Sequence, residues 1–225
     1  MSEFDGTDDK EERVAKLGSG ASVGLELSFL WSLGIFVSYF LTQIFFLLLL
    51  GLENFSYASG LNALIYIVAV PLCFKESFGR LKGLRIFILS VVATLAVNFL
   101  WSFVLEFLGK AELQEVAKRI SEIKGWDRLP VFISTALLIP CVEEVIFRLG
   151  FFKSLKKHFP VWGALLLSSV LFAVIHGEPL FFVPLTGLGF IFAYAYERTN
   201  CLWVAIALHS FNNALTLIDL WWDIL

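Results

Sequence analysis

Charged residues are scarce in this 225-residue chain, at 16% of the sequence against about 25% in soluble domains. The deficit is concentrated in long runs. Residues 27–52 include 26 consecutive positions without Asp, Glu, Lys or Arg, and residues 86–105 include 20. Because a helix that crosses a bilayer needs about 20 apolar residues, both runs are long enough to span a membrane.

Other scarcities exclude other classes of protein. There is no surplus of basic residues, since the net charge is −3, and this excludes an extended basic surface for nucleic acid. The only cysteines are Cys73, Cys141 and Cys201. An odd number, widely spaced in or beside apolar runs, predicts small core residues, neither a disulfide framework nor a metal site. Residues 1–26 are polar and acidic and lack the apolar core of a signal peptide, so we expect a tail without chemistry.

Seven apolar segments remain as candidate membrane spans. They are residues 27–52, 57–74, 85–108, 129–152, 161–176, 180–196 and 201–219. Residues 109–128 instead carry apolar residues at helical spacing among charges, which predicts an amphipathic helix on the membrane surface. The expected fold is therefore all-α: a polytopic membrane helical bundle of about seven to eight transmembrane helices plus one amphipathic interfacial helix, occupying residues 27–225.

The distribution of Lys and Arg predicts the orientation in the cell membrane. If the N-terminus is cytoplasmic, 11 of the 17 basic residues fall in cytoplasmic segments, and five fall on the opposite side, all within residues 109–128. Cytoplasmic loops of membrane proteins are enriched in Lys and Arg. We therefore expect a multi-pass protein whose N-terminus is cytoplasmic.

The fourth predicted span holds three ionisable residues, Glu143, Glu144 and Arg148. Such groups cost about 2.5–3.5 kcal/mol each in a membrane interior and are usually paired and functional. Glu144 and Arg148 are four residues apart, on one helix face, and can form an ion pair. Glu143 lies about 100° further round the helix, so it is the freer carboxylate. The alternative is that both acids serve only to hold Arg148.

Two of the three histidines also lie in apolar spans. His176 ends the fifth span, and His209 lies in the seventh with Asn213 four residues later on the same face. Either histidine alone is more typical of a structural hydrogen bond. At about 1.5 Å per residue, however, Glu143, His176, His209 and Asn213 fall about 10–21 Å deep in a core of about 30 Å. The four side chains can therefore share one site.

Such a cluster suits the activation of water. A carboxylate in an apolar site can act as a general base, and a neighbouring histidine can orient the same water or carry its proton. A second histidine with an asparagine on one helix face supplies donors for the oxyanion of a tetrahedral intermediate. Together these are the parts of peptide-bond hydrolysis without a covalent intermediate.

The motifs, taken in order, resemble a known family. They are Glu143-Glu144-x-x-x-Arg148, Phe172-x-x-x-His176 and His209-x-x-x-Asn213. This series is similar to the CAAX prenyl endopeptidase family, the group of Rce1-type and bacterial self-immunity (Abi) intramembrane proteases. The resemblance covers residues 129–219, and the earlier part of the chain matches only in being membrane-spanning.

The resemblance implies a helical membrane fold with a cavity open to the cytosol and a glutamate-dependent mechanism without a cofactor. By analogy, Glu143 and His176 activate water, while His209 and Asn213 stabilise the oxyanion. The supporting residues are Glu144, Arg148 and Phe172. The substrate implied is a peptide or protein, prenylated or otherwise membrane-anchored for some members and more diverse for bacterial ones.

Two other functions remain open at this point. Glu143, His176 and His209 are also a plausible zinc set for a metalloprotease, although the sequence has no His-Glu-x-x-His motif. Buried Glu and His residues also build proton relays in transporters, and an immunity protein or scaffold can bind without cleaving. The sequence lacks the serine motif of rhomboid proteases and the paired aspartates of presenilins, so both of those classes are set aside.

Overall fold

The computed structural model describes residues 30–31, 33–51, 58, 60–67, 83–109 and 115–222. All regular structure in these ranges is helical, and they include no strand. The prediction of an all-α fold is therefore confirmed. The predicted N-terminal tail lies outside the described residues, as does much of the predicted span 57–74, of which positions 60–67 are helical.

Four helical segments are long and apolar enough to cross a membrane, and they confirm the prediction of a membrane protein. They are Leu33–Leu50, Leu84–Phe107, Gly125–Leu155 and Pro179–Thr199. These segments correspond to the predicted spans at 27–52, 85–108, 129–152 and 180–196.

Two further helices coincide with predicted spans. Helix α8, Val161–Ile175, is apolar but has only 15 residues. Helix α10, Leu202–Trp222, has 21 residues, but it is not among the four segments that meet both the length and the apolarity requirement. Its polar side chains include His209 and Asn213, so two of the predicted site residues account for part of its lower apolarity.

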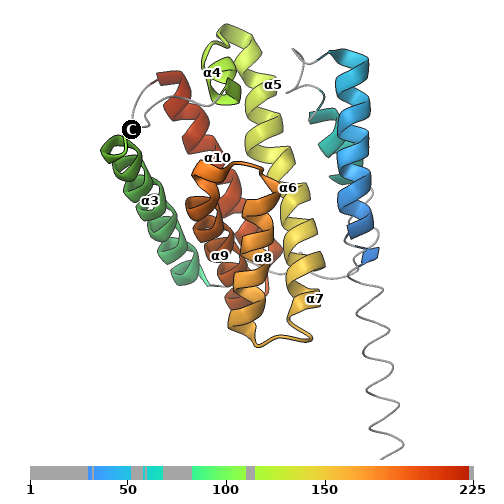
Figure 1. The fold of residues 1–225 in the computed structure, drawn as a ribbon, viewed down its shortest axis with the longest axis vertical. Helices are drawn as coiled ribbons and strands as arrows, with labels where there is room; N and C mark the ends of the chain where they lie inside the picture. Colours follow the sequence, from blue (N-terminus) through green and yellow to red (C-terminus); the bar gives the residue numbers. More distant parts are fainter. Residues whose placement is uncertain are drawn as a thin grey trace, which may run out of the picture.

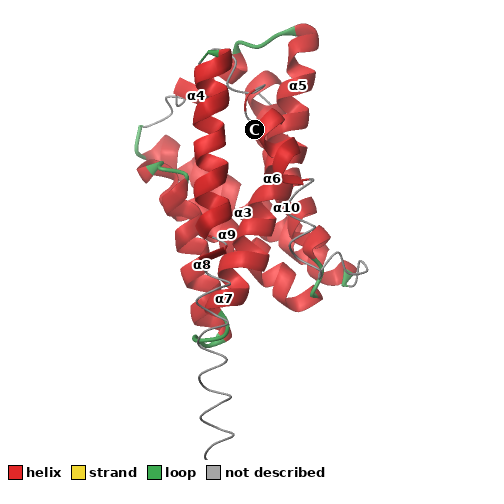
Figure 2. Cartoon of the chain, turned by 90° about the vertical axis from the view of Figure 1, so that its right-hand side faces the viewer, coloured by secondary structure: helices red, strands yellow, loops and turns green. Residues whose placement is uncertain are grey.

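The helices lie roughly side by side as a bundle (Figure 1). Helix α3 (Leu84–Phe107) stands at one edge and contacts α9 (Phe182–Thr199) and α10, while α8 packs along α9. The helix at Leu33–Leu50 stands at the opposite edge, beyond the long segment that contains α5, α6 and α7. Figures 1 and 2 both place the start of α5 and the end of α7 at opposite ends of the bundle.

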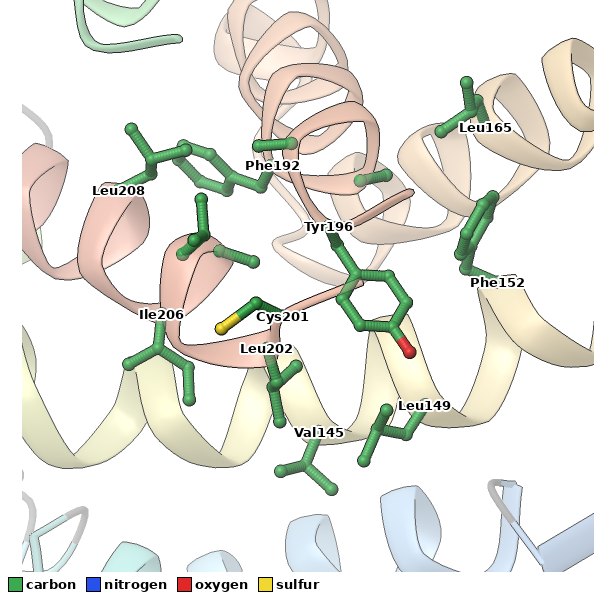
Figure 3. Close-up of a cluster of buried hydrophobic side chains, with 14 of the residues drawn as sticks. Val145, Leu149, Phe152, Leu165, Phe192, Tyr196, Cys201, Leu202, Ile206 and Leu208 are labelled. Atoms are coloured by element: carbon green, nitrogen blue, oxygen red, sulfur yellow. The ribbon is translucent and has the colours of Figure 1, made fainter. Parts of the chain in front are cut away.

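The largest apolar cluster lies where α8, α9 and α10 meet the second half of the long segment (Figure 3). Phe152, Phe192 and Leu202 are almost completely buried within it. Many side chains of α3 and of Leu33–Leu50 are instead exposed, among them Phe99 and Leu48. In a membrane protein these outward apolar side chains face lipid, so the bundle is apolar both inside and outside.

The long segment Gly125–Leu155 is helical throughout but is not a regular α-helix. Helix α5 (Arg128–Phe132) leads into a π-helical turn at Ile133–Leu138, and α6 (Ile139–Glu144) leads into a second one at Val145–Phe152. A π-helical turn fits one more residue into a turn than an α-helix does, and this changes the direction in which the following side chains point. Such turns are often found at functional sites. Both glutamates of the predicted site lie at the end of α6, between the two π-helical turns.

Pro140 lies just after the first π-helical turn and leaves one carbonyl group without its usual partner. In this turn the backbone N–H of Ile139 donates to the carbonyl oxygen of Ser134, five residues earlier. The same register would pair the next carbonyl, that of Thr135, with the nitrogen of Pro140, which carries no hydrogen. The Thr135 carbonyl is thus available to a side chain.

The predicted amphipathic segment contains α4, Glu115–Ser121, and a short turn at Gly125–Asp127. It packs on the ends of neighbouring helices: Ile120 and Ile123 contact a small cluster that includes Val131 and Leu217. The helix is much shorter than residues 109–128, and its place on the membrane surface stays a prediction.

Candidate active site

Glu144 and Arg148 form the ion pair that their spacing predicts. Arg148 Nε lies 2.6 Å from Glu144 Oε2 and Nη2 lies 3.2 Å from Oε1, and both side chains are completely buried. Two parallel charge-assisted hydrogen bonds of this kind offset part of the large cost of burying the charges. The guanidinium also lies over the ring of Phe172, 5.6 Å from its centroid.

Glu144 has a second partner that the sequence did not predict. His209 Nδ1 lies 3.0 Å from Glu144 Oε1. Because an ionised carboxylate only accepts hydrogen bonds, Nδ1 carries the proton and His209 is the donor. The imidazole stacks on Phe192 at 5.1 Å and meets the edge of Phe172 at 5.5 Å between centroids. One hydrogen bond and two rings therefore fix the orientation of His209, and its Nε2 points away from Glu144.

Glu143 is the freer of the two carboxylates, as its angle on the helix predicts. Its side chain is 22% exposed, and Oε2 lies 3.6 Å from His209 Nε2. That distance is too long for a hydrogen bond, and Glu143 forms none with any other described residue. Glu144 is thus occupied on both oxygens, whereas Glu143 is available to a substrate or to water.

His176 is placed beside this group but not in direct contact with Glu143. It follows the last residue of α8, and its Nδ1 lies 2.6 Å from the carbonyl oxygen of Phe172. A carbonyl only accepts, so Nδ1 is again the protonated nitrogen and Nε2 is left for other partners. Across the described residues His176 makes no hydrogen bond or ion pair with Glu143. The two histidines are connected through Phe172, whose ring centroid is 4.5 Å from that of His176.

Asn213 lies one helical turn after His209 on α10. Its Nδ2 donates to the Thr135 carbonyl at 3.0 Å, the group that Pro140 leaves without a backbone donor. Two further asparagines extend this contact. Asn212 Nδ2 donates to Asn213 Oδ1 at 3.4 Å, and Asn98 Nδ2 on α3 donates to Asn212 Oδ1 at 2.8 Å.

Asn98, Asn212 and Thr135 also belong to this site, although the sequence motifs do not include them. Asn98 is a polar residue in an apolar span, which is a signal that it has a partner. Asn212 adjoins a predicted site residue, and Thr135 contributes only its backbone. Nothing in the sequence identifies which of these groups meet.

The zinc alternative needs three ligands in one place. Of the predicted set, Glu143 and His209 lie close together, while His176 forms its hydrogen bond elsewhere. Within the part of the chain that the structure describes, no three His, Cys, Asp or Glu side chains are arranged to hold a metal ion. The described geometry thus offers two of the three expected ligands.

Comparisons with known proteins cover the same part of the chain. The family model for type II CAAX prenyl endopeptidase Rce1-like proteins matches residues 125–215. This range contains the predicted site residues from Glu143 to Asn213. No solved structure matches the chain.

Three bacterial proteins are similar to this chain over part or most of its length. The putative membrane peptidase YdiL of Bacillus subtilis is 34% identical over 88 residues, which is 39% of this chain and 36% of YdiL. The membrane-embedded CAAX protease MroQ of Staphylococcus aureus is 32% identical over 98 residues, 40% of each chain. The matched segments thus span well under half the length of these two relatives.

The third similarity is longer. The UPF0177 protein YxdF of Lactococcus lactis is 31% identical over 176 residues, which cover 72% of this chain and 96% of YxdF. The similarity therefore extends well beyond residues 125–215. Taken with the family match and the order of the three motifs, these findings confirm the resemblance drawn from the sequence. The chain belongs to the Rce1-like CAAX prenyl endopeptidase family of membrane proteins.

Proposed function

We propose that this protein is an intramembrane glutamic endopeptidase, which hydrolyses a peptide bond of a membrane-associated or lipidated substrate with water activated by Glu143 and His176. Membership of the family supports a membrane peptidase. The observation that supports the finer proposal is that the two glutamates differ in burial and in hydrogen-bond partners. Glu144 is buried between Arg148 and His209, while Glu143 keeps a partly exposed carboxylate beside His209 Nε2.

In the proposed reaction, Glu143 accepts a proton from a water molecule as the water oxygen bonds to the substrate carbonyl carbon. His176 assists through Nε2, the nitrogen that its bond to Phe172 leaves available. When the tetrahedral intermediate collapses, the C–N bond breaks and the leaving amine takes up the proton that Glu143 received. No bond forms between protein and substrate.

The negative charge that develops on the substrate oxygen needs donors. His209 Nε2 can donate when the ring carries both protons, and the Glu144 carboxylate on Nδ1 stabilises that form, as a carboxylate does in a Ser-His-Asp triad. Asn213 offers the second N–H of its amide. Donors held in place before the reaction lower the barrier most, and both of these side chains are held by hydrogen bonds.

The proposed substrate is a peptide or protein that the membrane presents to the site, prenylated or otherwise anchored. The side chains proposed for catalysis lie on helices embedded among apolar neighbours, so a substrate that already partitions into lipid reaches them most readily. The N-terminus is proposed to be cytoplasmic, from the distribution of Lys and Arg.

The test is cleavage by the purified full chain in detergent or nanodiscs. Substrates are a farnesylated quenched-fluorescent peptide, the same peptide without the lipid, and a labelled transmembrane peptide. Glu143→Gln should abolish cleavage while leaving the thermal unfolding midpoint unchanged. Glu197→Gln is a matched control, because Glu197 pairs with Lys156 on the surface. Full cleavage by the Glu143→Gln protein would contradict the proposal.

The same preparation separates the alternatives. A zinc metalloprotease would contain stoichiometric zinc, and chelation would remove zinc and activity together. A scaffold or immunity protein that binds without cleaving would retain its biological effect in both Glu143→Gln and His209→Ala cells, and a transporter that uses these residues as a proton relay would lose transport while wild-type protein cleaves none of the three substrates. The proposed mechanism requires that activity be insensitive to chelation and lost in both variants.

A further inference from the structure

A row of hydrogen bonds connects α3 to α10 and then to the π-helical turn. Asn98 Nδ2 on α3 donates to Asn212 Oδ1 at 2.8 Å. Asn212 Nδ2 donates to Asn213 Oδ1 at 3.4 Å, the longest of the three, and Asn213 Nδ2 donates to the Thr135 carbonyl at 3.0 Å. We call these four residues the asparagine relay.

The direction of the asparagine relay is set at its Thr135 end. A carbonyl oxygen only accepts, so the Asn213 amide must turn its nitrogen toward Thr135 and its oxygen toward Asn212. Asn212 must then present its nitrogen to Asn213 and its oxygen to Asn98. The Thr135 carbonyl is open to this contact because the backbone nitrogen that its register would offer belongs to Pro140. A single missing N–H therefore orients three side-chain amides.

The relay determines which group Asn213 can offer to a substrate. An asparagine amide has two N–H groups. One of them is on Thr135, and the other makes no hydrogen bond in the described part of the chain. If the amide turned by 180°, its oxygen would face the Thr135 oxygen and both N–H groups would leave that side. Two acceptors facing each other in a partly buried place are unfavourable, so the relay holds the donor side in place.

We propose that Asn98 is a positioning residue for catalysis: acting through Asn212, it fixes the amide of Asn213 so that the remaining N–H can bind the oxyanion. This inference rests on the proposed function and deepens it. Asn98 lies on α3, outside residues 125–215, where the family model matches. Its amide reaches α10 from a helix that also exposes large apolar side chains, such as Phe99, on its outer face.

The relay predicts a specific kinetic effect. Asn98→Leu keeps the side-chain volume but removes the donor, so Asn212 can rotate and Asn213 loses part of its support. We expect kcat to fall about tenfold with KM unchanged, less than the roughly 10²–10³-fold that follows removal of an oxyanion donor itself. Asn98→Gln retains an amide donor and should recover most of kcat. Ser102→Ala, one turn further along α3, removes only a bond to the helix's own Phe99 carbonyl and should match wild type.

A purely structural role for Asn98 gives a different pattern. If the amide only ties α3 to α10, Asn98→Leu lowers the thermal midpoint, and the kcat of the folded fraction stays at the wild-type value. That result would overturn the proposal. A fall in kcat that Asn98→Gln does not restore would also count against it, because the donor is the feature that the relay requires.

A second measurement keeps the relay separate from the proposed function. The side-chain amide signals of 15N-asparagine-labelled protein report their hydrogen bonds directly, and the Asn213 signal is assigned by its loss in Asn213→Leu. Asn98→Leu should shift the Asn213 signals, whereas Ser102→Ala should not. If wild-type protein cleaves none of the three substrates, the proposed function fails, and these signals alone decide whether Asn98 orients Asn213. An Asn213 signal that is unmoved in Asn98→Leu would refute the relay whether or not the protein cleaves.

Discussion

His209 donates its Nδ1–H to Glu144 Oε1 across 3.0 Å, and the same carboxylate accepts two hydrogen bonds from Arg148. One completely buried carboxylate thus links the positive charge on its own helix to an imidazole on α10. The bond fixes the tautomer of His209 and leaves Nε2 directed toward Glu143. The two adjacent glutamates are therefore expected to respond differently to the same substitution.

Glu144→Gln should impair both stability and activity. The substitution leaves the Arg148 guanidinium buried without its counter-charge, and breaking one side of a buried pair typically costs about 3–5 kcal/mol. It also removes the negative charge that stabilises the doubly protonated form of His209, although the amide oxygen of glutamine can still accept the Nδ1–H. The thermal midpoint in detergent should drop by several degrees, and cleavage by the remaining folded protein should fall.

Glu143→Gln is the matched comparison, because it changes the neighbouring residue in the same chemical way. Glu143 is partly exposed and forms no hydrogen bond with a described residue, so we expect an unchanged midpoint and no cleavage. If Glu143→Gln unfolded as readily as Glu144→Gln, the assignment of a structural role to one and a catalytic role to the other would be wrong.

Phe172→Leu should disturb both histidines at once. The ring is 1% exposed and contacts His176, His209 and the Arg148 guanidinium. Leucine preserves most of the apolar volume but removes the flat surface and the cation–π contact, which is worth about 2 kcal/mol or more when desolvated. We expect a modest loss of stability together with a larger loss of kcat, measured by melting curves and by cleavage. A change in stability alone would show that Phe172 is only a packing residue.

The surroundings of Phe172 depend on a glycine in α9. A Cβ at Gly189 would lie 3.2 Å from Phe172 Cδ1 and 3.3 Å from Ser169 Cα, so a larger residue there would force the Phe172 ring and the α8 backbone to move by a few tenths of an ångström. Gly189→Ala should destabilise the protein by about 1–3 kcal/mol through overpacking, seen as a lower thermal midpoint. Gly187→Ala is the control, since its Cβ would meet Val97 at an ordinary 3.6 Å. Equal midpoints for the two variants would contradict this account.

How much of the site follows from the sequence depends on whether its contacts are local. The pair of Glu144 and Arg148 is four residues apart in one helix, so helical geometry alone predicts it. The greater freedom of Glu143 follows from the same geometry. The bond from Glu144 to His209 joins residues 65 positions apart, and its existence depends on how α10 packs against α6. Depth along each span predicts that the groups can meet, but not which atoms do.

The fold shows the same division. The charge-free runs predict the positions of α3 and of the helix at Leu33–Leu50 within a few residues, because a long apolar helix has a simple signature. The π-helical turns around α6 have no comparable signature. Pro140 indicates that a backbone hydrogen bond is missing nearby. The sequence does not show that the carbonyl group without a backbone donor belongs to Thr135, or that Asn213 donates to it.

Arg128 provides a prediction at the end of the bundle away from α7. Its guanidinium lies 5.3 Å from the ring centroid of Trp221 and 4.9 Å from that of Trp222, and its Nε donates to the Ile123 carbonyl. This arrangement holds the segment after α4 against the end of α10, together with the bond from Trp221 Nε1 to the Ile120 carbonyl. Arg128→Ala should loosen that segment without touching the site.

The free energy that Arg128→Ala removes from this end of the bundle follows from the contacts that Arg128 makes. Cation–π contacts at partly exposed positions are worth about 0.5–1 kcal/mol each, and a hydrogen bond from a charged donor about 1.5–3 kcal/mol. We expect local loosening, measured as faster hydrogen exchange at Ile120 and Ile123 and a red shift of tryptophan emission. Arg128→Lys keeps the charge but not the flat guanidinium, so it should restore only part of the protection. If both variants exchanged at the wild-type rate, Arg128 would not be what holds this end closed, and the contact between Trp221 and Ile120 would be sufficient by itself.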